Sequence, residues 1–258
     1  MSWPFLVQQL INAAVVSALY GLLAVSYVLV HGITNRTNLA FGALAIWAGY
    51  IVIDLSLFLM LKLPGMTLVP VALAALYALV NTTIVGVLIE RATIRPLLGA
   101  PGLAMIVATL GIAMVLEESM RIQHGSRDLW LMPILADRLM LGGTDRFSLS
   151  LTAMQAALLA AAGGLGAGLV LFIRRHPFGR AWRACAQDLA MAELTGVDVG
   201  RTLLVTFAIA SAATAAAGIL LAVNYGSVSF YSGLVIGLKT LFVAVVGGLG
   251  SIGGAFAG

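Results

Sequence analysis

Seven long runs of apolar residues, almost free of charge, constrain the fold of this chain more than any other feature. They cover residues 5–30, 40–61, 67–89, 103–120, 148–173, 202–224 and 235–257. A helix needs roughly 20 apolar residues to cross the hydrocarbon core of a bilayer. The runs lack the period-two alternation that marks the strands of a membrane β-barrel. The pattern predicts an all-α fold: one transmembrane domain, residues 1–258, built as a polytopic helical bundle of about seven to eight spans.

Composition excludes a water-soluble domain. Hydrophobic residues make up 61% of the 258 residues, charged residues 9%, and the mean hydropathy is +1.07. A soluble domain carries about 25% charged residues to keep its surface hydrated. Cys185 is the only cysteine, so an intrachain disulfide and a cysteine metal cluster are both excluded. The N-terminus has no basic residue before its apolar run, so we expect a first span there rather than a cleaved signal.

The distribution of basic residues predicts the orientation. One set of loops carries eight of them: Arg36, Arg91, Arg95, Arg174, Arg175, Arg180, Arg183 and Arg201. The opposite loops carry five: Lys62, Arg121, Arg127, Arg138 and Arg146. Lysine and arginine accumulate in cytoplasmic loops. We therefore expect the 174–201 loop to be cytoplasmic and the N-terminus to be external, and we read the net charge of +4 as this bias rather than as a nucleic-acid surface.

The loop at 174–201 has the composition of a short helix outside the membrane. Residues 180–195 are rich in helix formers, and Gly196 stands where a helix stop is expected. A mixed surface of this kind suits docking into the cleft of a partner protein. It also suits a helix that lies on lipid headgroups. Periodicity alone leaves both interpretations open.

Motifs along the whole chain resemble the permeases of bacterial branched-chain amino acid ABC transporters. The matching residues are Gly179-Arg180-Ala181, Arg183-Ala184, Ala186-Gln187-Asp188, Ala192, Leu194, Gly196 and Asp198; Glu90-Arg91 and Arg95-Pro96-Leu97; Gly237-Leu238-Lys239, Gly247-Gly248, Gly250-Ser251 and Gly253-Gly254-Ala255; and Asn12, Ser17, Tyr20, Tyr27 and Gly32. The chain departs from the family pattern at residues 38–43, where the family's histidine and acid are missing, and Ile94 stands where a tyrosine is common. Family members also continue through one more apolar span beyond the position of Gly258.

The resemblance implies a permease in the bacterial inner membrane with several partners: a second, related permease, two cytoplasmic ATPases and a periplasmic binding protein. Transport would proceed by alternating access, and the residues implied in ATPase coupling are Gly179, Arg180, Arg183, Ala186, Gln187, Asp188, Ala192 and Gly196. ATP would be bound by the partner chains, and no cofactor is expected in this one. Consistent with this, the sequence contains no Gly-x-x-x-x-Gly-Lys-Ser/Thr loop. Relatives carry branched-chain or other hydrophobic amino acids, and some carry urea or short amides.

Polar residues within or beside the spans are candidates for the translocation path: Asn12, Tyr20, Asn38, Asp54, Glu117 and Lys239. Ionisable groups in hydrocarbon are costly and mark functional sites by default. We favour an interfacial pairing with Arg121 for Glu117 and its neighbour Glu118, and snorkelling to the interface for Lys239. For Asp54 a functional carboxylate and a misplaced span boundary are equally supported.

Two other function classes remain as alternatives. An ion-coupled secondary transporter needs a carboxylate near the membrane midplane, and only Asp54 qualifies. An intramembrane enzyme is disfavoured because His31, His124 and His176 all lie in loops. The series Gly248-x-Gly250-x-x-Gly253 fits the dinucleotide fingerprint by letter, yet lacks its strand, helix and acid. We expect Gly250, Gly254 and Gly258 to serve helix packing instead.

Overall fold

A computed structural model describes residues 3–63, 65–125, 129–132, 138–144 and 147–257. The chain forms these elements in order: α1 (Trp3–Thr34), α2 (Ala40–Lys62), α3 (Leu68–Ile89), the π-helix η1 (Glu90–Ile94), α4 (Gly102–His124), β1 (Leu129–Trp130), β2 (Arg138–Thr144), β3 (Phe147–Thr152), α5 (Ala153–Arg175), α6 (Pro177–Gln187), α7 (Leu189–Leu194), α8 (Val199–Tyr225), β4 (Ser227–Val228), α9 (Ser232–Gly247) and α10 (Ile252–Ala257). The predicted polytopic helical fold is confirmed.

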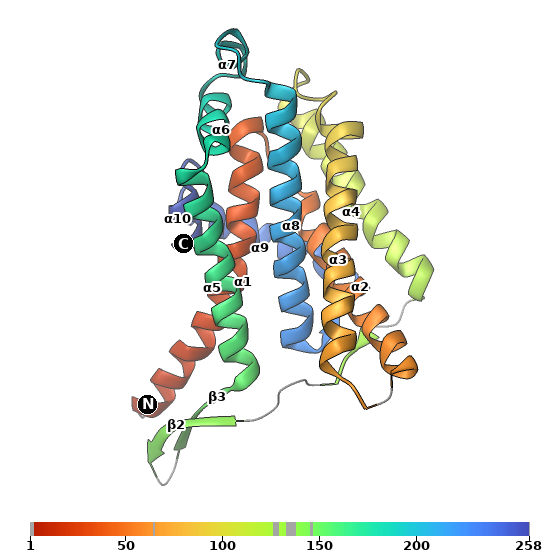
Figure 1. The fold of residues 1–258 in the computed structure, drawn as a ribbon, viewed down its shortest axis with the longest axis vertical. Coiled ribbons are helices and arrows are strands. Elements are labelled where there is room, and N and C mark those ends of the chain that lie inside the picture. The colour runs from red at the N-terminus through yellow and green to blue at the C-terminus, as the bar shows by residue number, and fades with distance from the viewer. Residues whose placement is uncertain (1–2, 64, 126–128, 133–137, 145–146, 258) are drawn as a thin grey trace.

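Six helices in the described part of the chain are long and apolar enough to cross a membrane. They are α1, α2, α3 with its continuation through η1, α4, α5 and α8. At least half of the residues in the most apolar stretch of α1, α2 and α8 are buried within the chain, whereas less than a third are buried in α3, α4 and α5. Helices α1, α2 and α8 therefore form the centre of the bundle, and α3, α4 and α5 lie outside them (Figure 1).

Small residues let the central helices approach closely. A Cβ added to Gly218 of α8 would overlap the carbonyl oxygen of Ala45 on α2. A Cβ added to Gly86 of α3 would overlap Oγ of Ser211 on α8. Lipid is as apolar as a leucine side chain, so helices in a membrane associate through such close packing rather than through a hydrophobic driving force.

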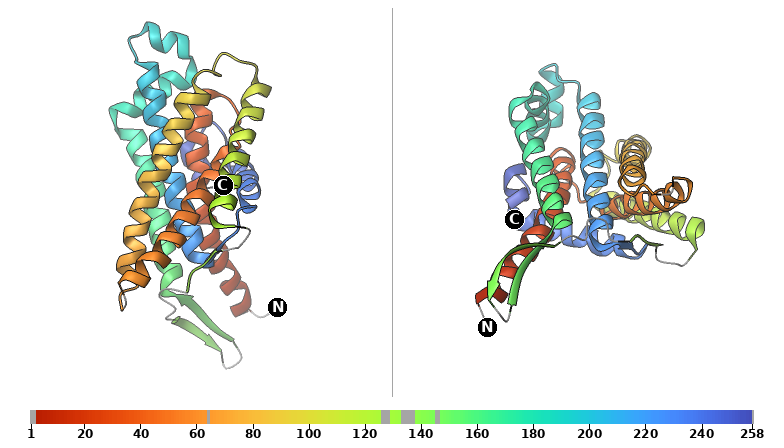
Figure 2. Two further views of the ribbon diagram at one scale, coloured as in Figure 1. Left: turned by 90° about the vertical axis from the view of Figure 1, so that its right-hand side faces the viewer. Right: turned by 60° about the horizontal axis from the view of Figure 1, so that its bottom comes forward.

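The loops separate into two ends of the bundle. Helices α6 and α7 lie at one end, together with the connections at 35–39 and 95–101, and we call this the α6–α7 end (Figure 1). The β2–β3 hairpin, the N-terminus and the α2–α3 turn lie at the other end, which we call the hairpin end (Figure 2). The connections at 35–39, 95–101 and around α6 and α7, which the sequence analysis placed on one side of the membrane, therefore lie at one end of the bundle.

Two predicted spans differ from the structure at their boundaries. The run 148–173 begins with a strand, because β3 (Phe147–Thr152) pairs antiparallel with β2, and α5 starts only at Ala153. Its first five residues, Ser-Leu-Ser-Leu-Thr, do alternate at period two, which is a strand signal. A second strand pair, β1 with β4, ties the 129–130 segment to the end of α8. Neither strand pair was predicted.

The seventh apolar run, 235–257, is two helices rather than one span. Helix α9 ends at Gly247, Gly248 takes a positive φ of 96°, and α10 starts at Ile252. A Cβ on Gly254 would overlap the carbonyl oxygen of Gly247, so the chain folds back on itself here. Of the three glycines predicted to serve helix packing, Gly254 makes a close approach, whereas a Cβ added to Gly250 would meet no atom within 4 Å and Gly258 lies outside the described residues. Both α9 and α10 lie at mid-height of the bundle (Figure 1).

Candidate functional sites

The predicted single helix over residues 180–195 is interrupted at Asp188. Asp188 has extended backbone angles and separates α6 from α7. Its Oδ1 accepts hydrogen bonds from the backbone N–H groups of Ala190, at 2.8 Å, and Met191, at 3.1 Å. Aspartate favours this N-cap role over a helix interior because its short side chain satisfies the free N–H groups of the next helix. Asp188 thus fixes the bend between α6 and α7.

Helix α7 ends in a tight glycine turn. Gly196 has a φ of +86°, its N–H donates to the carbonyl of Glu193, and the N–H of Val197 donates to the carbonyl of Ala192, both at 3.0 Å. This pair of bonds is the Schellman motif, in which a left-handed residue closes the last turn of a helix. The predicted helix stop at Gly196 is confirmed.

Trp182 fastens α6 to α1. Its side chain is 6% exposed, and its Nε1–H donates to the carbonyl of Leu29 at 3.0 Å. The indole lies directly over Gly32, where an added Cβ would meet the ring at 2.6 Å. Sequence reasoning missed this anchor, because nothing in the local pattern around Trp182 indicates a glycine on the first helix as its partner.

Further contacts hold α6 on the end of α5. Arg183 donates from Nη1 to the carbonyl of Ile173 at 3.1 Å, and an added Cβ on Gly179 would overlap the same oxygen. Cys185 is a buried residue of α6, and this burial raises the pKa of its thiol. Among the predicted coupling residues, Gly179 and Ala192 are therefore buried packing positions and Ala186 is half-buried.

The large exposed apolar side chains of the segment lie at its tip. Met191 is 60% exposed and Leu194 is 82% exposed on α7. Arg180, Gln187 and Gly196 are exposed as well. Sequence reasoning missed Met191, because it stands within the apolar run 189–192 and nothing in that run indicates which side chain is exposed.

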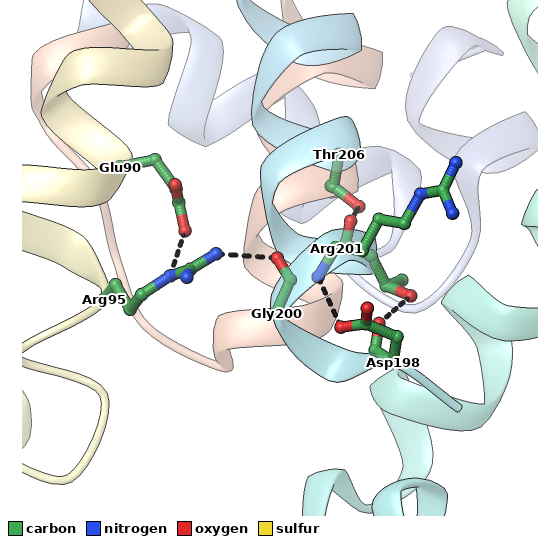
Figure 3. Close-up of polar contacts among 7 residues, drawn as sticks. Glu90, Arg95, Asp198, Gly200, Arg201 and Thr206 are labelled. Carbon is green, nitrogen blue, oxygen red and sulfur yellow. Dashed lines mark hydrogen bonds and ion pairs between the residues drawn. The ribbon is translucent and has the colours of Figure 1, made fainter. Parts of the chain in front are cut away.

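A polar contact ties the start of α8 to the end of α3 (Figure 3). Arg95 donates from Nη2 to the carbonyl of Gly200 at 2.7 Å and from Nε to Oε1 of Glu90 at 3.0 Å. Glu90 is fully buried, and its Oε2 has no hydrogen-bond partner among the described residues. The π-helix η1 makes this contact possible, because the N–H of Arg95 bonds to the carbonyl of Glu90, five residues back, and widens the turn.

The first turn of α8 is capped by Asp198 (Figure 3). Its Oδ1 accepts from the N–H of Arg201 at 2.8 Å, and its carbonyl accepts from Oγ1 of Thr202 at 2.7 Å. Only Val197 separates this cap from the Gly196 turn. The end of α7 and the start of α8 are thus joined by a short connection with hydrogen bonds on both sides.

The structure brings two of the six path candidates together. Tyr20 of α1 and Lys239 of α9 line one cavity of about 360 Å³, with Nζ of Lys239 5.9 Å from the centre of the Tyr20 ring. The cavity lies between α1, α2, α8, α9 and the 225–232 connection. It is a candidate for the substrate path.

The other candidates are dispersed. Asn12 is exposed and accepts a hydrogen bond from Gln8 on the same helix. Asn38 is buried just before α2, and its side chain accepts from the N–H of Ala40 at 2.9 Å. Asp54 lines a separate cavity of about 450 Å³, where its Oδ1 lies 3.6 Å from Nδ1 of His124. None of these three shares the Tyr20–Lys239 cavity.

Glu117 and Glu118 separate in the structure. Glu118 pairs with Arg121 one turn later, as predicted. Glu117 does not: it turns inward, and its Oε1 accepts from the N–H of Leu234 in the first turn of α9 at 3.2 Å. Glu117 therefore holds α9 in place from α4, and the predicted interfacial pairing is wrong for this residue.

Comparison with known proteins assigns the chain to a family. Residues 9–258 match the family model described as branched-chain amino acid transport system / permease component. The chain belongs to this permease family. It is 34% identical over 260 residues to the high-affinity branched-chain amino acid transport system permease protein LivH of Salmonella typhimurium and of Escherichia coli K12, covering 100% of this chain and 84% of each relative.

A third relative supports the same family. The high-affinity branched-chain amino acid transport system permease protein BraD of Pseudomonas aeruginosa is 33% identical over 254 residues, which cover 97% of this chain and 82% of the relative. No solved structure matches the chain. This permease is a multi-pass membrane protein whose relatives are transport subunits, and the resemblance deduced from its motifs is confirmed.

Proposed function

We propose that this permease is the membrane-spanning subunit of an ATP-driven importer for branched-chain or other hydrophobic amino acids, working by alternating access. Its partners would be a second permease, two ATPases and a periplasmic binding protein, and the membrane would be the bacterial inner membrane. The names of the relatives support the substrate class. The α6–α7 end would face the cytoplasm, where the basic residues are concentrated, and the N-terminus would be external.

The observation that carries the proposal is the construction of the α6–α7 segment. Its tip exposes Met191 and Leu194, whereas its base is fixed to three helices. Trp182 fixes it to α1 and Arg183 fixes it to α5, and the Gly196 turn continues within three residues into α8. A partner that bound the tip would therefore move α1 and α8, which form the centre of the bundle.

The Arg95 contact extends this connection. Through the carbonyl of Gly200 and the carboxylate of Glu90, Arg95 links the start of α8 to η1 and α3. Close-packed helices transmit displacement because they have few voids to absorb it. Motion at the tip would then reach α3 as well as α1 and α8, as alternating access requires.

Substitution at the tip tests ATPase coupling. We expect Leu194→Ser to insert and fold normally, because exposed side chains contribute little to stability. The variant should co-purify with less ATPase, or show less hydrolysis when loaded binding protein is added.

Leu61→Ser is the matched control. Leu61 is also 82% exposed but lies near the end of α2, at the hairpin end. Its variant should bind ATPase as the unaltered permease does. ATPase binding and stimulated hydrolysis unchanged in Leu194→Ser would refute docking through the tip and would favour a lipid-surface role for α6–α7.

A further inference from the structure

Lys239 lies in the middle of α9, not at its end. It is the eighth of the sixteen residues of Ser232–Gly247, and α9 lies at mid-height of the bundle (Figure 1). At 1.5 Å per residue, roughly 10 Å of helix separates it from either terminus. Snorkelling to the interface, the role expected from the sequence, requires a lysine near a helix end. Lys239 is exposed on the chain, and its place in the middle of α9 leaves snorkelling as an untested expectation.

The ammonium group of Lys239 has no charged partner in the described part of the chain. The ion pairs found there join Arg95 to Glu90, Arg121 to Glu118 and His124 to Asp54. Glu117, on the helix facing α9, is instead occupied by the N–H of Leu234. A lysine ammonium without a partner is costly at membrane depth unless it faces a polar cavity.

Lys239 does face such a cavity. Residues that carry hydroxyl groups line the space of about 360 Å³ beside it, and they come from several elements: Tyr20, Tyr225, Ser227, Ser229 and Ser232. The remaining wall is aliphatic: Ala45, Ile46, Leu221, Ala222, Val228, Val235 and Ile236. Cavities of this size, mostly apolar with a few convergent polar groups, are typical of small-molecule sites.

We propose that this cavity is the transient substrate site of the permease and that Lys239 binds the carboxylate of an amino acid while its side chain lies against the aliphatic wall. The inference rests on the proposed transport function and specifies the chemistry of its path. Among the described residues that line it, the cavity has one cation and no carboxylate, so it selects an anionic group over a cationic one. It also decides between the substrate classes of the family's relatives, because urea and short amides carry no charge to pair with Lys239.

The hydroxyl groups complete the site. Ser227 and Ser229 lie in the connection between α8 and α9, and Tyr225 is the last residue of α8. Hydroxyls can accept from the ammonium group of a zwitterionic amino acid without the cost of a second buried charge. The ammonium group is therefore accommodated but not strongly selected, whereas the carboxylate is required.

Competition binding tests this selection directly. The probe is radiolabelled L-leucine bound to the purified complex of both permeases and the ATPases, with no binding protein present. Two competitors separate the functional groups: 4-methylpentanoate keeps the carboxylate and the branched chain, and isopentylamine keeps the amine and the branched chain. We expect 4-methylpentanoate to compete and isopentylamine not to compete.

Substitutions then assign the selection to Lys239. Lys239→Met should weaken leucine binding about tenfold or more, because a charge-assisted hydrogen bond is lost. Lys239→Arg should keep most of the affinity. Lys62→Met is the matched control, since Lys62 also stands 5.9 Å from an aromatic ring, that of Phe58, but at the end of α2. It should bind leucine as the unaltered complex does.

Several results would overturn the inference: no leucine binding to the unaltered complex, equal competition by the two analogues, or undiminished binding by Lys239→Met. The proposed function has a separate readout. ATPase that co-purifies with Lys239→Met, and responds to loaded binding protein, shows an intact importer whatever the binding result. Absence of ATPase from the unaltered permease would instead overturn the importer proposal itself.

Discussion

The turn at Gly196 allows the connection between the tip and α8 to be weakened without disturbing any packing. Gly196 has a φ of +86°, and an added Cβ would meet no atom within 4 Å. Alanine would therefore encounter no steric neighbour, and its cost would be purely conformational. This separates Gly196 from Gly179, where the same methyl group would overlap a backbone oxygen.

The size of the effect follows from the backbone conformation. A residue with a Cβ pays about 1–2 kcal/mol to occupy the left-handed region. Helix α7 has only six residues and is closed by the two bonds to the carbonyls of Glu193 and Ala192. The conformational cost therefore lowers the free energy needed to open α7 locally by the same amount. With RT near 0.59 kcal/mol, the open fraction of α7 should rise about 5- to 30-fold. The membrane-spanning helices should be unaffected.

Hydrogen exchange measures this opening. In the purified complex, amides of the segment 191–197 should exchange about 5- to 30-fold faster in Gly196→Ala, in line with the conformational cost. Stimulated ATP hydrolysis should fall in parallel if the tip must be ordered to dock. Gly196→Asn should show a smaller change, because asparagine tolerates the left-handed region.

Gly200→Ala provides the control four residues further on. Gly200 lies in the first turn of α8, and an added Cβ would be no closer than 3.5 Å to Asp198 and 3.6 Å to Arg95, which is ordinary contact. In Gly200→Ala, the amides of the segment 191–197 should exchange at the unaltered rate or more slowly. Unaltered exchange in Gly196→Ala, or equal acceleration in both variants, would refute the argument.

Three further predictions concern other parts of the molecule. Arg95→Met should lower the free energy of unfolding by about 1–3 kcal/mol, because it leaves the buried carboxylate of Glu90 unpaired. Adding Glu90→Gln should restore part of this loss in a double-mutant cycle. Asp54→Asn should reduce leucine uptake only mildly, whereas complete loss in a well-assembled variant would favour an ion-coupled transporter. In a Cys185→Ala background, Leu194→Cys should resist membrane-impermeant maleimide in intact cells and react after permeabilisation; labelling in intact cells would reverse the orientation. The native thiol of Cys185 is unsuited to this test, because it is buried and its pKa is raised.

The spans with uninterrupted apolar composition were predictable to within a few residues. The run 40–61 became α2 (Ala40–Lys62), and the run 202–224 became α8 (Val199–Tyr225). Both lengths follow from the thickness of the hydrocarbon core, which the sequence must match. The prediction for the run 148–173 failed at its start because five residues with alternating polarity, 148–152, were counted as part of an apolar run.

The two-helix form of the tip was within reach of local reasoning. Asp188 precedes Leu189 and Ala190 as an N-cap precedes a helix, and the predicted single helix overlooked that signal. The break after Gly247 was signalled less clearly, since Gly248 and Gly250 also fit a helix-packing pattern. In that case only the approach of Gly254 to Gly247 shows that the chain turns back.

The sequence by itself determined that the chain is a membrane protein, where its long apolar segments lie, which loops lie at the same end of the bundle, and to which family it belongs. Those properties depend on composition and on local order along the chain. The tertiary structure alone decided that Lys239 meets Tyr20, that Trp182 lies on Gly32, and that Glu117 holds α9. The physical reason is that the central helices are apolar on all sides, so no amphipathic stripe indicates which face turns inward. Their rotation is fixed by the close contacts of small residues far apart in the chain, and the cavity follows from that packing.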